Sequence, residues 1–176
     1  DRETVMAQVR DYDAEMAAAL RQAGNVYLGQ FLEVMETGDR VKPLEPNTKA
    51  TLEALESRGF FIPFPESARS TLNKANDIQP PLKALIEAAR GVGYAEAFAD
   101  KDGTRRRFPL VLLYENRAMP SLALIMLCDY LQVPLSRLQI REGRHIRIPG
   151  ARMPDGRIRD LVVPIDAKGQ MLVNWA

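Results

Sequence analysis

The spacing of apolar residues changes along this chain, and the change limits the folds it can adopt. Near the start, Tyr12, Met16 and Leu20 recur every four residues, the spacing of one helix face. Near the end, Leu138 and Ile140 begin an alternation of apolar and polar residues that is typical of strands. We therefore predict an α/β fold in which helices pack on a mixed sheet, with a helix-rich N-terminal half and a strand- and hairpin-rich C-terminal half.

The helices are bounded by Gly and Pro. Gly24 is predicted to end the first helix, and Gly91 the third, because Gly is common at helix C-termini. Pro120 and Ser121 are predicted to start the last helix, which is apolar on most sides and should be buried. The predicted helices cover Val5–Gly24, Thr48–Ser57, Pro80–Gly91 and Ser121–Leu131.

Predicted strands occupy much of the remaining chain. A first hairpin is predicted across Glu142-Gly143, and a second joins Leu161–Ile165 to Gln170–Trp175 across the turn Asp166–Gly169. The pattern leaves Ser67–Ile78 open between helix and loop, and predicts a loop at 36–46. Further extended segments are Val26–Val34, Phe60–Pro65, Val92–Phe98 and Phe108–Tyr114, the last two joined by a turn at Asp100–Gly103.

Length and composition limit the class of protein to which this chain can belong. A chain of 176 residues, 46% of them apolar, suits one domain with a core. Its single Cys cannot form an internal disulfide, nor a Cys/His zinc site with its single His. The net charge of +1 divides into −5 over residues 1–100 and +6 over residues 101–176. The whole-chain charge therefore indicates no polyanionic partner.

The sequence contains no apolar run near the roughly 20 residues that cross a bilayer, and no signal-peptide pattern at its start. It opens on Asp1 without Met and closes inside a predicted strand. We expect the chain to be part of a longer protein, with targeting segments outside it.

Catalytic and metal-binding patterns are weak, so we predict no catalytic residue, metal or cofactor. His145 lies in an Arg-rich hairpin without a nucleophile beside it, which is typical of an exposed strand residue. Asp100 and Asp102 resemble the start of a calcium loop, but Gly103 comes at the fourth place where that loop needs Gly at the sixth. A turn is the better interpretation.

Two further patterns favour structural interpretations. The sequence Gly91-Val92-Gly93 leaves a predicted helix for a strand, so we interpret it as a helix C-cap and not as a dinucleotide-binding loop. Cys128 lies in the apolar helix, where a buried thiol behaves as a small hydrophobe.

Arginines gather in the basic half of the chain. The region 137–159 could bind a polyanion, but it lacks aromatic residues, and Arg147 alternates with Ile as on the solvent face of a sheet. In the run Arg105–Arg107 the first and last side chains share a face opposite Arg106. We expect at least one of the three to pair with an acid or to pack inward.

Three segments carry a family resemblance. The first is GVGYAEAFADKDGTRRRFPLVLLYENRAMPSLAL, and the others are the closing VVPIDAKGQMLVNWA and the opening DAEMAAALRQAGNVYLGQ. In their order along the chain, these three segments resemble the second family of CHASE domains, which are extracytoplasmic sensor modules associated with cyclases and histidine kinases. The residues that carry the resemblance are Asp100, Asp102, Gly103, Arg105, Arg106, Pro109, Leu110, Pro120, Ser121, Leu122, Ala123, Pro164, Asp166, Gly169, Asn174 and Trp175.

The resemblance implies a non-enzymatic sensory domain of a bacterial transmembrane signalling protein, with its ligand-binding residues unknown. Its expected partners are a small-molecule stimulus, the membrane helices and cytoplasmic output domain of the same chain, and a second copy in a homodimer, but no nucleic acid. The output domain would be a nucleotide cyclase or a kinase. The family's usual opening, an acidic strand with a Trp-Pro-Arg segment, is not in this sequence. We thus expect residues 1–176 to be one sensor domain that lacks its N-terminal segment.

Most motif residues are expected to serve the architecture. Asp102 and Gly103 would make a turn, Arg105 or Arg106 would anchor the following strand through an ion pair, and Ser121 would start the core helix. Two rival functions stay open at this point. One is a small soluble enzyme, and the other is a soluble nucleic-acid or polyanion binder that uses the region 137–159.

Overall fold

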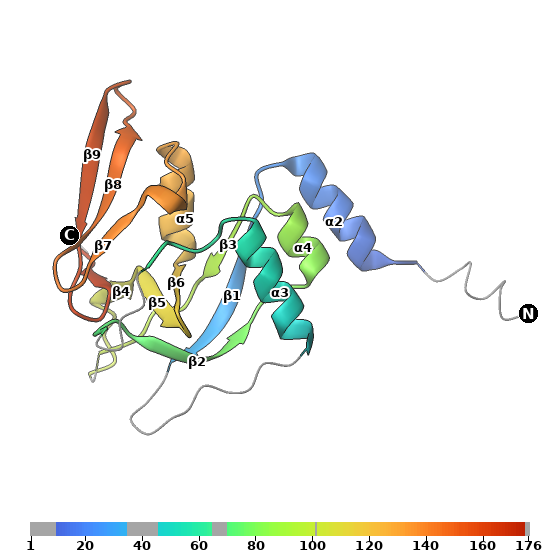
Figure 1. The fold of residues 1–176 in the computed structure, drawn as a ribbon, viewed down its shortest axis with the longest axis horizontal. Helices are drawn as coiled ribbons and strands as arrows, with labels where there is room; N and C mark the ends of the chain where they lie inside the picture. The colour runs from blue at the N-terminus through green and yellow to red at the C-terminus, as the bar shows by residue number, and fades with distance from the viewer. Residues whose placement is uncertain (1–9, 35–45, 65–69, 101, 175–176) are drawn as a thin grey trace, which may run out of the picture.

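The computed structural model describes residues 10–34, 46–64, 70–100 and 102–174 (Figure 1). The start of the first predicted helix, most of the predicted 36–46 loop and Trp175 lie outside these residues. The helices are α2 (Tyr12–Ala23), α3 (Pro46–Ser57), α4 (Lys83–Ala88) and α5 (Leu122–Tyr130), with a 3-10 helix at Leu135–Arg137. The strands are β1 (Tyr27–Val34), β2 (Lys74–Gln79), β3 (Gly91–Tyr94), β4 (Arg107–Pro109), β5 (Val111–Tyr114), β6 (Arg117–Pro120), β7 (Gln139–Arg141), β8 (His145–Arg152), β9 (Ile158–Pro164) and β10 (Gln170–Leu172).

The central sheet has the strand order β3-β1-β2-β5-β6. Strands β1 and β3 run parallel, as do β2 and β5, whereas β1 with β2 and β5 with β6 are antiparallel. Strands β7, β8 and β9 form a second sheet, and β4 pairs with β10 (Figure 1). The predicted α/β fold with a mixed sheet is confirmed.

Two apolar cores lie on opposite faces of the central sheet. Alternate residues of β5 supply both, since Val111 and Leu113 join one core while Leu112 and Tyr114 join the other. The first core also contains α5 residues and the inner face of β8, and the second lies under α3 and α4. Figure 1 shows α3 and α4 on one side of the sheet and α5 with β7–β9 on the other.

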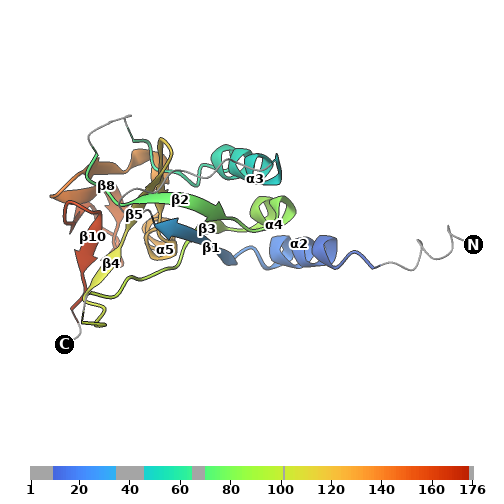
Figure 2. The same cartoon turned by 90° about the horizontal axis from the view of Figure 1, so that it is seen from below.

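Helix α2 ends at Gly24, as predicted, with φ of 68° at that residue. Its predicted apolar face is wrong in part, because Tyr12 and Met16 are 67% and 56% exposed. The buried residues are Ala17 and Leu20, which pack with α4. Figure 2 shows α2 at the margin of the domain, where it lies beside α4, and its buried side chains also meet Val26 and Leu28 at the start of β1.

The pair Gly91 and Gly93 is a strand and not the helix C-cap that the sequence suggested. Helix α4 ends earlier, at Ala88, and β3 begins directly at Gly91. A Cβ at Gly91 would lie 2.7 Å from a side-chain carbon of Ile125, and a Cβ at Gly93 would lie 2.7 Å from the backbone nitrogen of Leu122. These glycines are needed because β3 passes directly against α5.

The segment Ser67–Ile78, which the sequence left open between helix and loop, contains most of strand β2, so that interpretation is wrong for Lys74–Ile78. The sequence of β2, KANDIQ, has little β-propensity, but the strand lies between β1 and β5 and bonds to both. Pairing on both edges fixes the strand where local preference does not. The sequence also gave no sign of β6, which follows a two-residue turn after β5 and pairs with it.

One predicted hairpin is confirmed and the other is wrong. Strands β7 and β8 pair with Ile140 opposite Ile146, across a turn in which Gly143 has φ of 66°. The turn at Asp166–Gly169 is present, but its two strands do not pair with each other. Strand β9 pairs with β8, and β10 pairs with β4. The strand predicted at Phe108–Tyr114 divides at Leu110 into β4 and β5, which is how β4 can leave the central sheet for β10.

Candidate functional site

A tight acidic turn precedes β4. Gly103 has φ of 80° and donates its backbone N–H to the Asp100 carbonyl over 2.8 Å. The Asp102 carboxylate accepts the backbone N–H of Thr104 at 3.1 Å. Asp and Gly therefore do here what the sequence predicted, since Asp accepts a backbone amide and Gly takes the left-handed conformation.

Ion pairs connect this turn to the arginine run. Arg106 donates to both oxygens of Asp102, at 3.0 and 2.8 Å, and to Asp100 at 3.2 Å. Arg107 donates to the other oxygen of Asp100 at 2.9 Å. The Arg106 guanidinium lowers the pKa of the Asp102 carboxyl. The prediction that at least one of the three arginines pairs with an acid is confirmed. We name residues 100–107 the acidic turn.

A second turn, at Asp166–Gly169, lies against the first. One oxygen of the Asp166 carboxylate accepts the backbone N–H groups of Lys168 and Gln170, both at 2.9 Å, and the other lies 3.9 Å from the Arg107 guanidinium. Gly169 has φ of 79°, and a Cβ there would lie 2.7 Å from the Val111 carbonyl oxygen. Gly169 is thus required both by its conformation and by its contact with β5.

The structure brings most of the family-motif residues together where β4 pairs with β10. Pro109 lies opposite Gln170, the Gly169 carbonyl accepts the N–H of Leu110, and Pro164 ends the neighbouring β9. We name residues 97–110 and 163–174, as far as the structure describes them, the β4–β10 junction. It contains Asp100, Asp102, Gly103, Arg105, Arg106, Pro109, Pro164, Asp166, Gly169 and Asn174.

Pro120 and Ser121 join the junction through β5. The Ser121 N–H donates to the Leu110 carbonyl at 2.9 Å, and its side-chain oxygen accepts the Leu124 N–H at 3.2 Å. Ser121 is therefore the predicted start of α5, while Pro120 is the last residue of β6. This places the N-terminus of α5 beside the junction.

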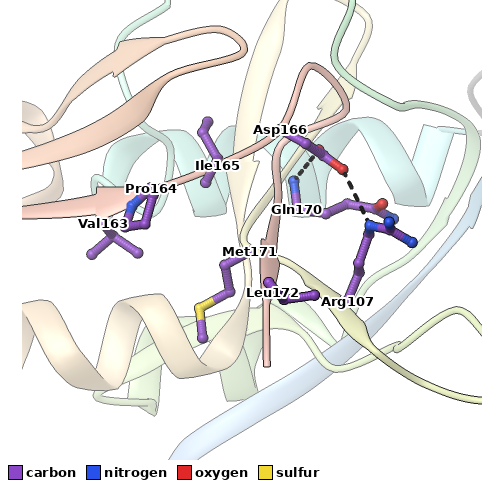
Figure 3. A pocket seen from close by; sticks show the side chains of 8 residues that line it. All are labelled: Arg107, Val163, Pro164, Ile165, Asp166, Gln170, Met171 and Leu172. Atoms are coloured by element: carbon purple, nitrogen blue, oxygen red, sulfur yellow. Dashed lines mark hydrogen bonds and ion pairs between the residues drawn. The ribbon is translucent and has the colours of Figure 1, made fainter. Parts of the chain in front are cut away.

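Three surface pockets adjoin Arg107. One, of about 370 Å³, lies between the end of β9 and β10, and Figure 3 shows Arg107 there with Asp166 and Gln170. A polar pocket of about 540 Å³ lies between the end of β1, the acidic turn and the Asp166 turn. The third, of about 430 Å³, has apolar walls and is lined by Ala97, Arg105, Arg107, Phe108, Leu110, Ala123, Met171 and Val173. We call it the apolar pocket.

A polar cluster that the sequence did not reveal joins β1, β3 and α5. Asp129 accepts the Tyr27 hydroxyl and two N–H groups of Arg90, at 3.0 and 2.8 Å. Arg90 holds the pKa of the Asp129 carboxyl below its usual value, and burial together with Asp129 raises the pKa of Tyr27. The three residues are far apart in the sequence, and no local pattern connects them.

Two more polar side chains are buried within the central sheet. Tyr94 and Gln30 lie opposite each other on β3 and β1, and they are 0% and 2% exposed. The Tyr94 hydroxyl and the Gln30 side-chain carbonyl have no hydrogen-bond partner among the described residues. Burial raises the pKa of Tyr94 well above its usual value.

The remaining candidates occupy structural positions. His145 is a half-buried strand residue at the start of β8. Cys128 is buried in α5, as predicted, and burial raises the pKa of its thiol to about 12. Among the described residues, no group of three or more His, Cys, Asp or Glu side chains could hold a metal ion.

Three arginines of the region 137–159 have acidic neighbours. Arg147 bonds to Asp160, and Asp155 lies 3.6 Å from Arg159 and 3.9 Å from Arg157. Arg147 lies on the exposed face between buried isoleucines, as the alternation predicted. Ion pairing of this kind reduces the positive field that a nucleic-acid surface requires.

The fold is α/β, and most family-motif residues gather at the β4–β10 junction beside three pockets. The family model of the CHASE2 domain matches residues 2–176, so the chain belongs to this family. CHASE2 domains are extracytoplasmic, non-catalytic sensory domains of signalling proteins. No curated protein and no solved structure matches the chain. Within the described residues, no helix has the length and apolarity needed to span a bilayer.

Proposed function

We propose that this domain senses a small molecule on the extracytoplasmic side of a bacterial inner membrane and regulates a cytoplasmic nucleotide cyclase or kinase of the same protein. Membership of the CHASE2 family supports the sensory role. The observation that supports a ligand role for the β4–β10 junction is the convergence there of motif residues from two separate segments, around Arg107 and its three pockets.

The junction can convert binding into a change of conformation. A ligand shifts an equilibrium between two arrangements only by its different affinities for them. The acidic turn and the Asp166 turn meet at Arg107 through exposed ion pairs. Such contacts contribute little individually, so a bound ligand can favour one arrangement of the two turns over another.

The experiment has two parts, both in bacterial membranes. In the first, alkaline phosphatase, which is active only outside the cytoplasm, is fused after residue 176, and we expect phosphatase activity. In the second, the full-length protein without the fusion is used, and we expect cyclic nucleotide synthesis or phosphorylation that changes with an added stimulus. An Asp166→Asn variant, matched with Asp155→Asn on the β8–β9 hairpin, should change the response while the Asp155 variant leaves it unaltered. A fusion without phosphatase activity, or an output insensitive to both the junction and the stimulus, would contradict the proposal.

A further inference from the structure

Helix α2 has a second apolar face that the fold does not bury. Its inner face, Ala17 and Leu20, packs with α4 and the start of β1. Tyr12 and Met16 lie on another side of the helix and are 67% and 56% exposed. Because α2 lies at the margin of the domain (Figures 1 and 2), a second molecule can reach this side of it.

The exposed face has the spacing of a contact between two helices. Tyr12, Met16, Ala19 and Ala23 follow one another at intervals of four, three and four residues, and all four are exposed. Alternating intervals of four and three place side chains along the seam between two packed helices, as in a coiled coil. A contiguous exposed apolar patch is typical of an interaction site. We name these four residues the α2 stripe.

The α2 stripe complements itself when two copies run antiparallel. Its two large side chains lie in the first half of the helix, and its two alanines lie in the second half. Antiparallel pairing puts Tyr12 opposite the second copy's Ala23, and Met16 opposite the second copy's Ala19. Large side chains then face small ones, which lets the two helices interlock. One two-fold axis generates each contact twice, as in most homodimers.

The charges of α2 favour the same direction. Residues 10–15 contain three acids and one arginine, Arg10, which bonds to Glu15. Two negative charges remain there, whereas the last turn of the helix contains Arg21. A parallel pair would place the two acidic first turns side by side, where like charges repel. An antiparallel pair separates them and puts each one beside the basic last turn of the other helix.

We propose that the α2 stripe is the interface between two copies of this chain, which pair their α2 helices antiparallel. A contact between two 12-residue helices belongs with small, transient interfaces, which bury less than about 1,200 Å². The isolated chain therefore forms a weak, reversible dimer. This inference goes beyond the proposed function and depends neither on the ligand nor on the output domain of the receptor.

Sedimentation equilibrium of the 176-residue chain tests the pairing. We expect a monomer–dimer equilibrium with a dissociation constant between about 10 µM and about 1 mM. Met16→Glu buries a charge without a partner in the stripe and should raise that constant about tenfold or more. Ala18→Glu, at an exposed position of the same helix outside the stripe, is the matched control and should dimerise as the wild type does.

Two results would overturn the proposal. One is a wild-type chain that stays monomeric at about 1 mM. The other is a Met16→Glu chain that dimerises as strongly as Ala18→Glu, because the dimer would then use a different surface.

Disulfide formation between cysteine variants tests the direction of the helices. The single native cysteine, Cys128, is buried, so the wild type should not cross-link. A mixture of Tyr12→Cys and Ala23→Cys chains, distinguished by mass, should form a mixed disulfide dimer on mild oxidation. Tyr12→Cys alone should not, because its two copies lie about 16 Å apart along the helix axis. A mixture without the mixed disulfide, or a disulfide dimer of Tyr12→Cys alone, would refute the antiparallel interface.

Discussion

The acidic turn and the contact between β3 and α5 both depend on glycine and on a carboxylate bound by arginine, but for different reasons. In the acidic turn, a Cβ at Gly103 would meet no atom within 4 Å, so its glycine serves backbone conformation alone. In the β3–α5 contact, a Cβ at Gly93 would lie 2.7 Å from the Leu122 nitrogen, so its glycine serves packing. The first region is open and locally determined, and the second is closed and determined by the whole fold.

The carboxylates differ in the same way. Arg106 reaches Asp102 across four positions, with both side chains about half exposed. Asp129 instead accepts from Tyr27, which lies 102 positions away, and from Arg90. The Arg90–Asp129 pair is also open to solvent, with side chains 50% and 35% exposed. The difference is in what the contacts join: the Arg106–Asp102 pair spans a single turn, whereas Asp129 joins α5 to β1 and to the residue before β3. The comparison teaches that local contacts gather at the β4–β10 junction and long-range ones at the central sheet.

The largest expected effect tests the two glycines. Gly93→Ala should lower the free energy of unfolding by about 2–3 kcal/mol, because backbone atoms of Leu122 must shift to admit the methyl group. Gly103→Ala should lower it by only about 1 kcal/mol, the cost of a left-handed alanine. Urea unfolding of both variants measures the difference.

A matched control supports this comparison. Gly156 also has positive φ, of 79°, with no atom near its Cβ position. Gly156→Ala should behave like Gly103→Ala. If Gly93→Ala cost no more than these two, the close contact between β3 and α5 would be disproved.

The next effect concerns two tyrosine hydroxyls in the sheet. Tyr27→Phe removes a hydrogen bond to Asp129 and should destabilise the fold by about 1 kcal/mol. Tyr94→Phe removes a buried hydroxyl that has no partner among the described residues, so stability should stay unchanged or rise. Thermal unfolding of both variants gives the result. A loss of stability in Tyr94→Phe would show that the hydroxyl has a partner, such as a bound water molecule.

A smaller effect appears in the pH dependence of stability. In the folded chain, the pKa of the Asp129 carboxyl lies below its ordinary value of 3.8, chiefly because Arg90 donates a hydrogen bond to it. Its stabilising contribution is therefore present above the unfolded pKa and is lost as the pH falls through the folded value. Asp129→Asn should show a shallower loss of stability than the wild type between about pH 5 and about pH 3. Parallel curves from urea unfolding would contradict the assignment.

The same division explains what the sequence could predict. The acidic turn, its ion pairs and the β7–β8 hairpin involve residues within a few positions of each other, so spacing and turn chemistry reveal them. The partner of β10, the strand β2 and the cluster around Asp129 depend on segments that meet only after folding. Gly91 shows most clearly what a local sequence pattern cannot predict. Its position after a helix suggests a cap, and only the nearness of Ile125 shows why it is glycine.

The site could be predicted in part. The sequence singled out the motif residues, and the resemblance joined them in one family, but it did not show that the residues near 100 and those near 166 meet at Arg107. Arg107 was not among the motif residues, although it adjoins all three pockets. Its importance follows from the pairing of β4 with β10, which the prediction of a β9–β10 hairpin had excluded.

The smallest expected effect on stability tests the local ion pairs of the acidic turn. Arg106→Ala breaks ion pairs whose side chains are largely exposed, so the melting temperature should fall by no more than about 2 °C. Under the proposed function, the same variant in the full-length receptor should change the response to its stimulus, because Arg106 holds the turn that positions Arg105 and Arg107. Differential scanning calorimetry measures the melting temperature, and the output assay measures the response to the stimulus. A large fall in melting temperature would make Arg106 a structural anchor comparable to Arg90, and the contrast between the two regions would fail.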